Sequence, residues 1–243
     1  MPKPELKKPV KRSGSIWVRA SRVRSALVRA VCRALEGVYG APRLGNPKQS
    51  LDDLVYIIVS NKTTPWMARL TYRRLRDRYE TWDDVLASPP AVLRSILKPA
   101  GLSTAKSRQL RAALRKIKRD FGKCDLRVLR SKAQDEIHAY LTGLPGVSDK
   151  VAKCVMMYTM GAHVLPVDAH VHRVATRLGW TARKRADQCH EELESLVPPE
   201  LRYSFHVGCV LHGREVCRPE NPACKRCCIN RYCEYFRKAN GKG

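Results

Sequence analysis

The feature that most constrains the fold is a group of cysteines near the C-terminus. Four of them are spaced C-x6-C-x2-C-x5-C, at Cys217, Cys224, Cys227 and Cys233. Thiolates this close in sequence can close around one metal centre, either a Zn²⁺ ion or an iron–sulfur cluster. A structural zinc site usually draws on two C-x2-C pairs, and this segment has only one. The spacing therefore favours a [4Fe–4S] cluster held by these four residues.

The other cysteines are expected to be free thiols. The N-terminus is charged and lacks the apolar stretch of a secretory signal, and no run of apolar residues approaches the length of a membrane span. The ten cysteines are therefore expected to be reduced or metal-bound, in a cytoplasmic protein. Cys228 breaks the four-thiol spacing and is expected to face away, and Cys209 is expected to be buried.

The charge of the chain indicates the kind of partner it binds. Lys and Arg number 47 and Asp and Glu number 22, which gives a formal net charge of +25. Such a surface attracts polyanions. Because hydrophobic residues make up 44% of the chain, a packed core is expected and wholesale disorder is excluded. The charge thus favours a protein that binds phosphate backbones.

Hydrophobic periodicity predicts an all-α fold. Residues 1–15 are rich in Lys and Pro and are predicted to form a disordered basic arm. Apolar residues recur at helical spacing over 16–39 and 106–121. Residues 52–76 are predicted to form two helices separated by a polar interruption at 60–64. Strand signals are few, because β-branched runs never alternate cleanly with polar residues.

A short turn at residues 143–150 lies between two helical patterns. Pro145 and Gly146 favour a tight turn, and the first amides of the following helix are a suitable site for a phosphate. Lys150 falls in the first turn of that helix, where the helix dipole and the surrounding positive charge disfavour its ammonium form. A neutral amine is a nucleophile that can attack a sugar C1′ and form a Schiff base.

Asp168 is predicted to cap the next helix. It lies two residues after Pro166 and precedes a helical apolar face that includes Val171 and Val174. Capping amides hydrogen-bond to the charged carboxylate and keep it ionised. Near a neutral lysine, such a carboxylate can stabilise a sugar oxocarbenium ion. His170 and His172 lack a metal-ligand spacing and are expected to be structural or to face phosphates.

In combination, these motifs resemble the endonuclease III family of helix-hairpin-helix DNA glycosylases. The resemblance extends from about residue 20 to residue 236. The family motif L-P-G-V-G-x-K corresponds to residues 144–150, and the motif V-D-T-H corresponds to 167–170. A G-L-x-x-x-K loop is present at 101–106, and the four-cysteine spacing is matched without a gap.

The resemblance implies two helical domains flanking a DNA-binding cleft. A six-helix domain with the helix-hairpin-helix would comprise residues 51–162. A discontinuous domain carrying the [4Fe–4S] cluster would comprise 16–50 and 163–243. The implied partner is double-stranded DNA that contains damaged bases or abasic sites. The protein is expected to be monomeric, not bound to a membrane, and associated with the nucleoid.

The resemblance also implies an activity in base excision repair. The enzyme would be a bifunctional DNA glycosylase and abasic-site (AP) lyase that excises damaged, chiefly oxidised, pyrimidines. Lys150 would displace the base, form a Schiff base and nick the strand by β-elimination, with support from Asp168. Leu102 would wedge into the base stack. The expected DNA-binding residues are Lys62, Leu102, Leu144, Gly146 and Ser148.

The chain departs from the family in three places, and two alternatives compete with the proposed activity. One departure is extra length between Lys106 and Gly143. Ser148 replaces the second hairpin glycine, and Lys62 replaces a glutamine that fills the gap left by the flipped base. The first alternative is a monofunctional glycosylase for mismatched or other bases, but such relatives normally lack a lysine at position 150. The second alternative is a non-catalytic DNA-binding protein that senses redox state. Lys150→Ala separates these readings, because only a lyase has nicking activity to lose.

Overall fold

The computed structural model describes residues 14–241, and this part of the chain is helical and contains no strand. The all-α prediction is therefore confirmed. The predicted basic arm lies outside the described residues, except for Gly14 and Ser15, where the first helix begins. None of the helices in the described part of the chain has the length and apolar character needed to span a membrane.

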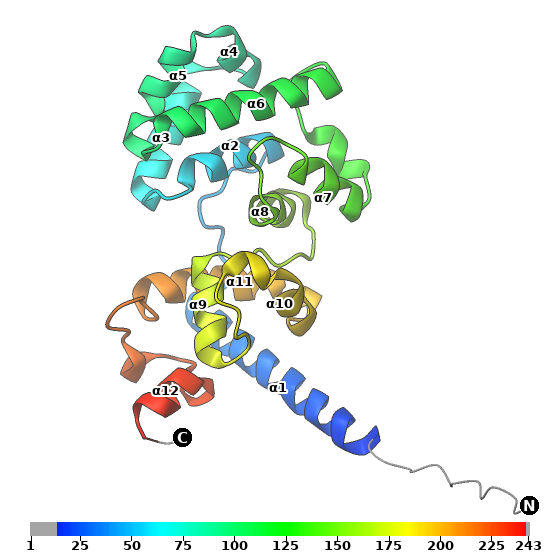
Figure 1. The fold of residues 1–243 in the computed structure, drawn as a ribbon, viewed down its shortest axis with the longest axis vertical. Coiled ribbons are helices and arrows are strands. Elements are labelled where there is room, and N and C mark those ends of the chain that lie inside the picture. Colours follow the sequence, from blue (N-terminus) through cyan, green and yellow to red (C-terminus); the bar gives the residue numbers. More distant parts are fainter. Residues whose placement is uncertain (1–13, 242–243) are drawn as a thin grey trace, which may run out of the picture.

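Twelve α-helices and six short 3₁₀ segments follow one another along the described residues (Figure 1). The α-helices are α1 (Gly14–Tyr39), α2 (Ser50–Ser60), α3 (Pro65–Arg78), α4 (Trp82–Ala87), α5 (Pro90–Leu97), α6 (Ser103–Phe121), α7 (Gln134–Thr142), α8 (Asp149–Met160), α9 (Ala169–Leu178), α10 (His190–Leu196), α11 (Arg202–Glu215) and α12 (Glu234–Ala239). The 3₁₀ segments are η1 (Lys98–Ala100), η2 (Arg127–Ser131), η3 (Ala186–Gln188), η4 (Pro199–Leu201), η5 (Cys224–Arg226) and η6 (Asn230–Tyr232).

Local signals explain the main helix boundaries. The predicted interruption at 60–64 is confirmed, since α2 ends at Ser60 and α3 begins at Pro65. Proline is well suited to a first helical position, and the Thr64 side chain caps α3 by accepting a hydrogen bond from the Met67 amide. The helix predicted over 106–121 is also confirmed as α6, which ends before Gly122 at a positive φ of 77°.

Two clusters of buried apolar side chains form the interior. The first core cluster is built mainly from α2 to α8 and includes Leu54 and Leu114. The second core cluster is built from α1, α9, α10, α11 and the C-terminal loops and includes Leu35 and Phe205. Figure 1 shows these two groups of helices one above the other. The chain passes between them twice, after α1 and after α8.

The first group contains the helices α2 to α8. The short helix α4 is one of them. It begins because Thr81 and Asp84 form a capping box, in which each side chain accepts a hydrogen bond from the other residue's amide. Between the two groups, the N-terminal ends of α8 and α9 face a common space.

Candidate active site

A cavity of about 660 Å³ lies between the two groups of helices. The first group lines it with the end of α2, the loop at 60–63 and the start of α8. The second group lines it with the start of α9 and with part of α11. Lys150 and Asp168 both line this cavity. The two residues singled out from separate motifs are therefore brought to one cleft.

Lys150 is the second residue of α8 and is half-buried. The helix is started by Ser148, whose hydroxyl accepts a hydrogen bond of 3.4 Å from the Val151 amide. The Val151 amide, one of those expected to face a phosphate, is therefore already hydrogen-bonded to Ser148. Lys150 itself takes part in no ion pair among the residues whose side chains the structure describes. Its amine is free to approach a ligand in the cleft.

The hairpin before α8 is held by its glycine and by α6. Gly146 has a positive φ of 75°, and the Gln109 side chain donates a hydrogen bond to its carbonyl oxygen. A Cβ at position 146 would lie 2.5 Å from the Gln109 side chain, so only glycine fits. Leu144 is only 2% exposed and packs in the first core cluster. Its expected contact with DNA is therefore restricted to its backbone.

Asp168 caps α9, as its sequence context predicts. Its Oδ1 accepts hydrogen bonds of 2.9 Å from the amides of His170 and Val171. Burial in itself raises the pKa of Asp168. The His206 ring, the Val171 amide and the Lys150 charge act in the opposite direction and prevail, so the pKa lies below the ordinary value of 3.8. The carboxylate is ionised at neutral pH, and Lys150 is close enough to act on it.

Two histidines in the cleft have defined tautomers. Nδ1 of His206 lies 2.9 Å from the Pro166 carbonyl oxygen, which can only accept, so Nδ1 carries the proton. Nδ1 of His170 lies 3.0 Å from the guanidinium of Arg173, which can only donate, so Nδ1 accepts. Burial lowers the pKa of both rings. His206 carries no signal in the sequence, because no motif marks its place in the buried face of α11.

Arg173 connects α9 to the cysteine-rich end of the chain. Its guanidinium donates to the carbonyl oxygens of Gly213 at 2.9 Å and Cys217 at 2.8 Å, in addition to His170. A Cβ at Gly213 would lie 2.6 Å from Nδ1 of His170. The glycine is therefore required for this close approach. One arginine thus fixes both the cleft histidine and the start of the C-terminal loop.

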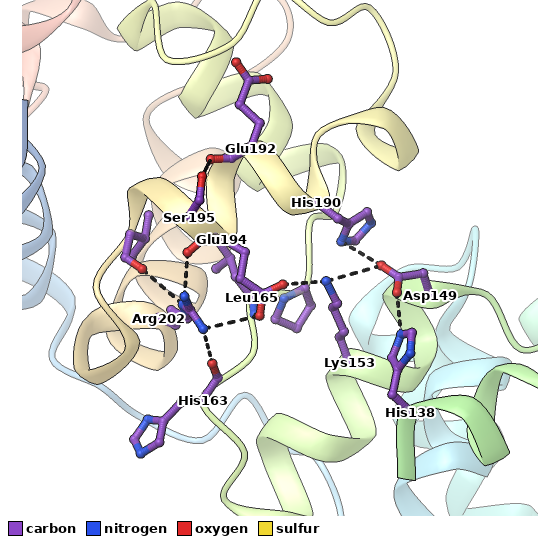
Figure 2. A network of polar contacts seen from close by, with 12 residues as sticks. His138, Asp149, Lys153, His163, Leu165, His190, Glu192, Glu194, Ser195 and Arg202 are labelled. Atoms are coloured by element: carbon purple, nitrogen blue, oxygen red, sulfur yellow. Dashed lines mark hydrogen bonds and ion pairs between the residues drawn. The ribbon is translucent and has the colours of Figure 1, made fainter. Parts of the chain in front are cut away.

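A second polar network joins the two groups of helices beside Lys150 (Figure 2). Asp149 accepts a hydrogen bond of 2.6 Å from His138 of α7, and its other oxygen lies 3.0 Å from Nδ1 of His190 of α10. Lys153 pairs with Glu194 at 2.5 Å and lies 3.6 Å from Asp149. Figure 2 shows these side chains directed toward one another across the gap between α8 and α10.

Asp149 is the most strongly perturbed group of this network. Burial raises its pKa, but the His190 and His138 rings and the Lys153 charge together outweigh burial, so its pKa lies well below the ordinary carboxyl value. The residue directly before Lys150 is therefore tied to the opposite group of helices. The sequence contained no signal for this network, since its partners are scattered from α7 to α11.

Lys62 and Leu102 share an unusual backbone conformation. Their φ angles are 52° and 51°, in the left-handed region that non-glycine residues rarely adopt. Lys62 is exposed and lines the cleft. Leu102 is 58% exposed, although it is a large apolar residue, and it directly precedes α6. Two exposed side chains are thus presented on strained loops, at positions that the sequence associated with DNA.

The four cysteines of the C-terminal motif line one small, apolar cavity. Cys228 does not line it, and Cys209 is fully buried in the second core cluster, as expected for both. Arg177 donates to the Cys217 sulfur at 3.1 Å, and the His212 ring lies 3.4 Å from the Cys227 sulfur. Among the side chains that the structure describes, no three or more of His, Cys, Asp or Glu are arranged to hold a metal ion. Four thiols around one space fit a multi-iron cluster, which is wider than a single ion.

Comparisons with known proteins agree with this arrangement. The family model described as HhH-GPD superfamily base excision DNA repair protein matches residues 55–199. Endonuclease III of Thermotoga maritima is 28% identical over 78% of this chain and 84% of its own length. A thymine/uracil-DNA glycosylase of Methanothermobacter thermautotrophicus is 26% identical over 77% and 82%. A solved non-covalent endonuclease III–DNA complex superposes with a TM-score of 0.78 at 24% identity, covering 90% of this chain and 99% of that one.

Proposed function

The chain belongs to the HhH-GPD superfamily of base excision DNA repair proteins and, within it, to the endonuclease III family. From this premise we propose that it is a bifunctional DNA glycosylase and AP lyase that acts on oxidised pyrimidines. We further propose that residues 51–162 form one domain and that 16–50 with 163–243 form the other. The two core clusters support this division. Duplex DNA with a damaged or abasic nucleotide would occupy the cleft between them.

One observation carries the proposal: a lysine without an ion pair and an ionised carboxylate line the same cleft. In the proposed reaction the Lys150 amine bonds to the sugar C1′ while the bond from C1′ to the base breaks. The base leaves with that electron pair and takes up a proton. Asp168 stabilises the positive charge that develops on the sugar as the base departs.

The second half of the proposed reaction cuts the strand. Opening of the sugar ring gives an imine between the Lys150 nitrogen and C1′. Loss of a proton from C2′ then expels the 3′ phosphate and breaks the DNA backbone. Water adds to the imine and releases the lysine. Every step uses the amine of Lys150, so the lyase activity depends on this single side chain.

The DNA contacts follow from the same geometry. The free amides at the start of α8, around Gly146 and Ser148, would bind a backbone phosphate. Lys62 and Leu102 would enter the base stack at the flipped nucleotide, where apolar and long side chains replace lost stacking. The net charge of +25 would supply the non-specific part of the affinity.

We also propose that Cys217, Cys224, Cys227 and Cys233 hold a [4Fe–4S] cluster. Their shared cavity supports this assignment. When bound, the cluster supplies a covalent cross-link between loops that contain little regular secondary structure. The four thiolates would fix those loops against α9 through Arg173 and Arg177. Iron and sulfide contents near zero in protein purified without air would contradict the assignment.

A monofunctional glycosylase is the second candidate. The similarity to a thymine/uracil-DNA glycosylase favours it, at nearly the same identity as to endonuclease III. The presence of Lys150 argues for the lyase, because relatives that activate water with a carboxylate normally lack a lysine there. A non-catalytic DNA-binding protein would leave the pairing of Lys150 with Asp168 without a purpose.

Borohydride trapping on abasic duplex DNA tests the proposal. Borohydride reduces an imine to a stable amine, so we expect the wild-type protein to form a covalent adduct. Lys150→Ala should form none while it still binds the duplex. Lys123→Ala, which removes an exposed lysine of the loop after α6, is the control and should behave as the wild type. Binding of wild-type protein without any adduct would exclude the lyase and favour the monofunctional candidate.

A further inference from the structure

Lys106 is a buried lysine to which the proposed reaction assigns no role. It is the lysine of the G-L-x-x-x-K motif and the fourth residue of α6, and only 4% of it is exposed. Its Nζ donates hydrogen bonds of 2.7 Å to the Val59 carbonyl, 2.8 Å to the Thr63 hydroxyl and 2.7 Å to the Ala100 carbonyl. An ammonium has three N–H groups, and each has a partner here.

The three acceptors lie on two separate segments of the chain. Val59 and Thr63 flank the loop that carries Lys62, and Ala100 lies in the turn that leads to Leu102. The Thr63 hydroxyl also donates to the Ala100 carbonyl, which adds a direct link between the loops. One ammonium group therefore connects the two strained segments that would enter the DNA.

This position is costly for a lysine. Lys106 forms no ion pair with any carboxylate in the described part of the chain. Burial lowers the pKa of its ammonium to about 8, whereas its three hydrogen bonds favour the charged form. An apolar side chain of similar length would fill the space without desolvating a charge. A buried lysine at this position is explained if it is needed to set the geometry of the two loops, and not only to stabilise the fold.

We propose that Lys106 is a positioning residue that locks the Lys62 loop to the Leu102 loop, so that both side chains enter the duplex as one unit. The proposal rests on the proposed function, since it assumes that these two residues replace the stacking of a flipped nucleotide. Free loops would have to be ordered at each insertion. The lysine removes that entropic cost by holding both loops in their strained conformation before DNA binds.

Arg111 provides a matched control on the same helix. It is also a buried cation, 8% exposed, and its guanidinium also donates to three carbonyl oxygens, those of Val85, Leu86 and Ser88. These carbonyls lie at the end of α4, which does not line the cleft. Loss of Arg111 should therefore affect stability alone, whereas loss of Lys106 should also affect the insertion into DNA.

The test compares Lys106→Met with Arg111→Met on DNA that cannot react. The DNA is a duplex that contains a tetrahydrofuran abasic analogue with 2-aminopurine as the neighbouring base. The fluorescence of 2-aminopurine rises when this base is unstacked, so the rise reports insertion of the protein into the base stack. We expect Lys106→Met to reduce the apparent affinity in this assay about tenfold. Trapping on single-stranded abasic DNA, which has no stack to enter, should change less than about twofold. Arg111→Met should leave both readouts unchanged.

Other outcomes would overturn the proposal. Equal losses on duplex and single strand, or equal losses in both variants, would mean that Lys106 only stabilises the fold. If Lys106→Met does not fold, Thr63→Val is the second variant, because it removes the hydroxyl between the two loops. Thr63→Val should also lower the apparent affinity for the duplex, by a smaller factor. An unchanged affinity of Thr63→Val for the duplex would overturn the proposal. The fluorescence assay involves no chemical reaction. A wild-type protein that unstacks the duplex but forms no covalent adduct with abasic DNA would therefore contradict the proposed lyase activity, but not the proposed role of Lys106 in linking the two loops.

Discussion

The two sides of the cleft hold their charged groups in different ways. On the α9 side, Asp168 accepts two amide hydrogen bonds, and the neighbouring His170 is fixed by Arg173. On the α8 side, the side chain of Lys150 has no ion pair among the described residues, and only the backbone around it is fixed. Ser148 caps the helix, and Asp149 ties it to α10.

The difference matches what each group is proposed to do. A carboxylate that stabilises a developing charge is most effective when it is already oriented, because no reorganisation is then needed during the reaction. An amine that must form and release a covalent bond has to move toward the sugar, and any strong partner would have to be broken first. Rigidity on one side and freedom on the other are therefore both favourable.

The largest expected effect comes from Asp168→Asn. Asparagine caps helices about as well as aspartate, so the melting temperature should change little. The loss of the negative charge should slow base excision about 10²–10³-fold, as for other preorganised electrostatic groups. Single-turnover excision and thermal unfolding measure the two quantities separately. A variant that loses stability but excises normally would show that Asp168 is only a helix cap.

An intermediate effect is expected from Gly213→Ala, which disturbs the rigid side. The added Cβ would lie 2.6 Å from His170 and 2.9 Å from Arg173, so both side chains must shift. Overpacking of this kind typically costs about 1–3 kcal/mol. Denaturant unfolding measures the cost. Gly37→Ala in α1 is the control, because its Cβ would meet nothing within 4 Å; it should be neutral or slightly stabilising. Equal results for both variants would contradict the close packing at Gly213.

The smallest effect is expected from Asp149→Asn, which tests the tie on the α8 side. The pKa of Asp149 is lower in the folded protein than the ordinary 3.8. The contribution of Asp149 to the unfolding free energy is therefore fully present at a pH above 3.8, and it is lost as the pH falls from 3.8 toward the pKa of the folded protein. The wild-type advantage in unfolding free energy over the variant should be present at pH 5 and shrink below pH 4. The partners His138, His190 and Lys153 remain in both proteins.

The comparison for this experiment is Asp77→Asn, which replaces an exposed carboxylate of α3. Its unfolding free energy should follow that of the wild type at every pH. A parallel pH dependence for Asp149→Asn and the wild type would mean that the network around Asp149 contributes no net stabilisation. The junction beside Lys150 would then depend on apolar packing alone.

The sequence determined the features that depend on neighbours in the chain. The break between α2 and α3, the cap at Asp168 and the four-cysteine motif all follow from residues a few positions apart. Helix periodicity, capping and ligand spacing are short-range, so they are visible before the chain folds. The all-α fold and the family follow from the same local patterns.

Only the tertiary structure decided how these local elements meet. It placed Lys106 against two segments, joined Asp149 to His190, and buried the side chain of Leu144, a residue that the motif had assigned to DNA. Such contacts join residues far apart in sequence, and they depend on the angle and spacing at which whole helices pack. No local pattern encodes that packing, because it results from the burial of apolar surface by the whole chain at once.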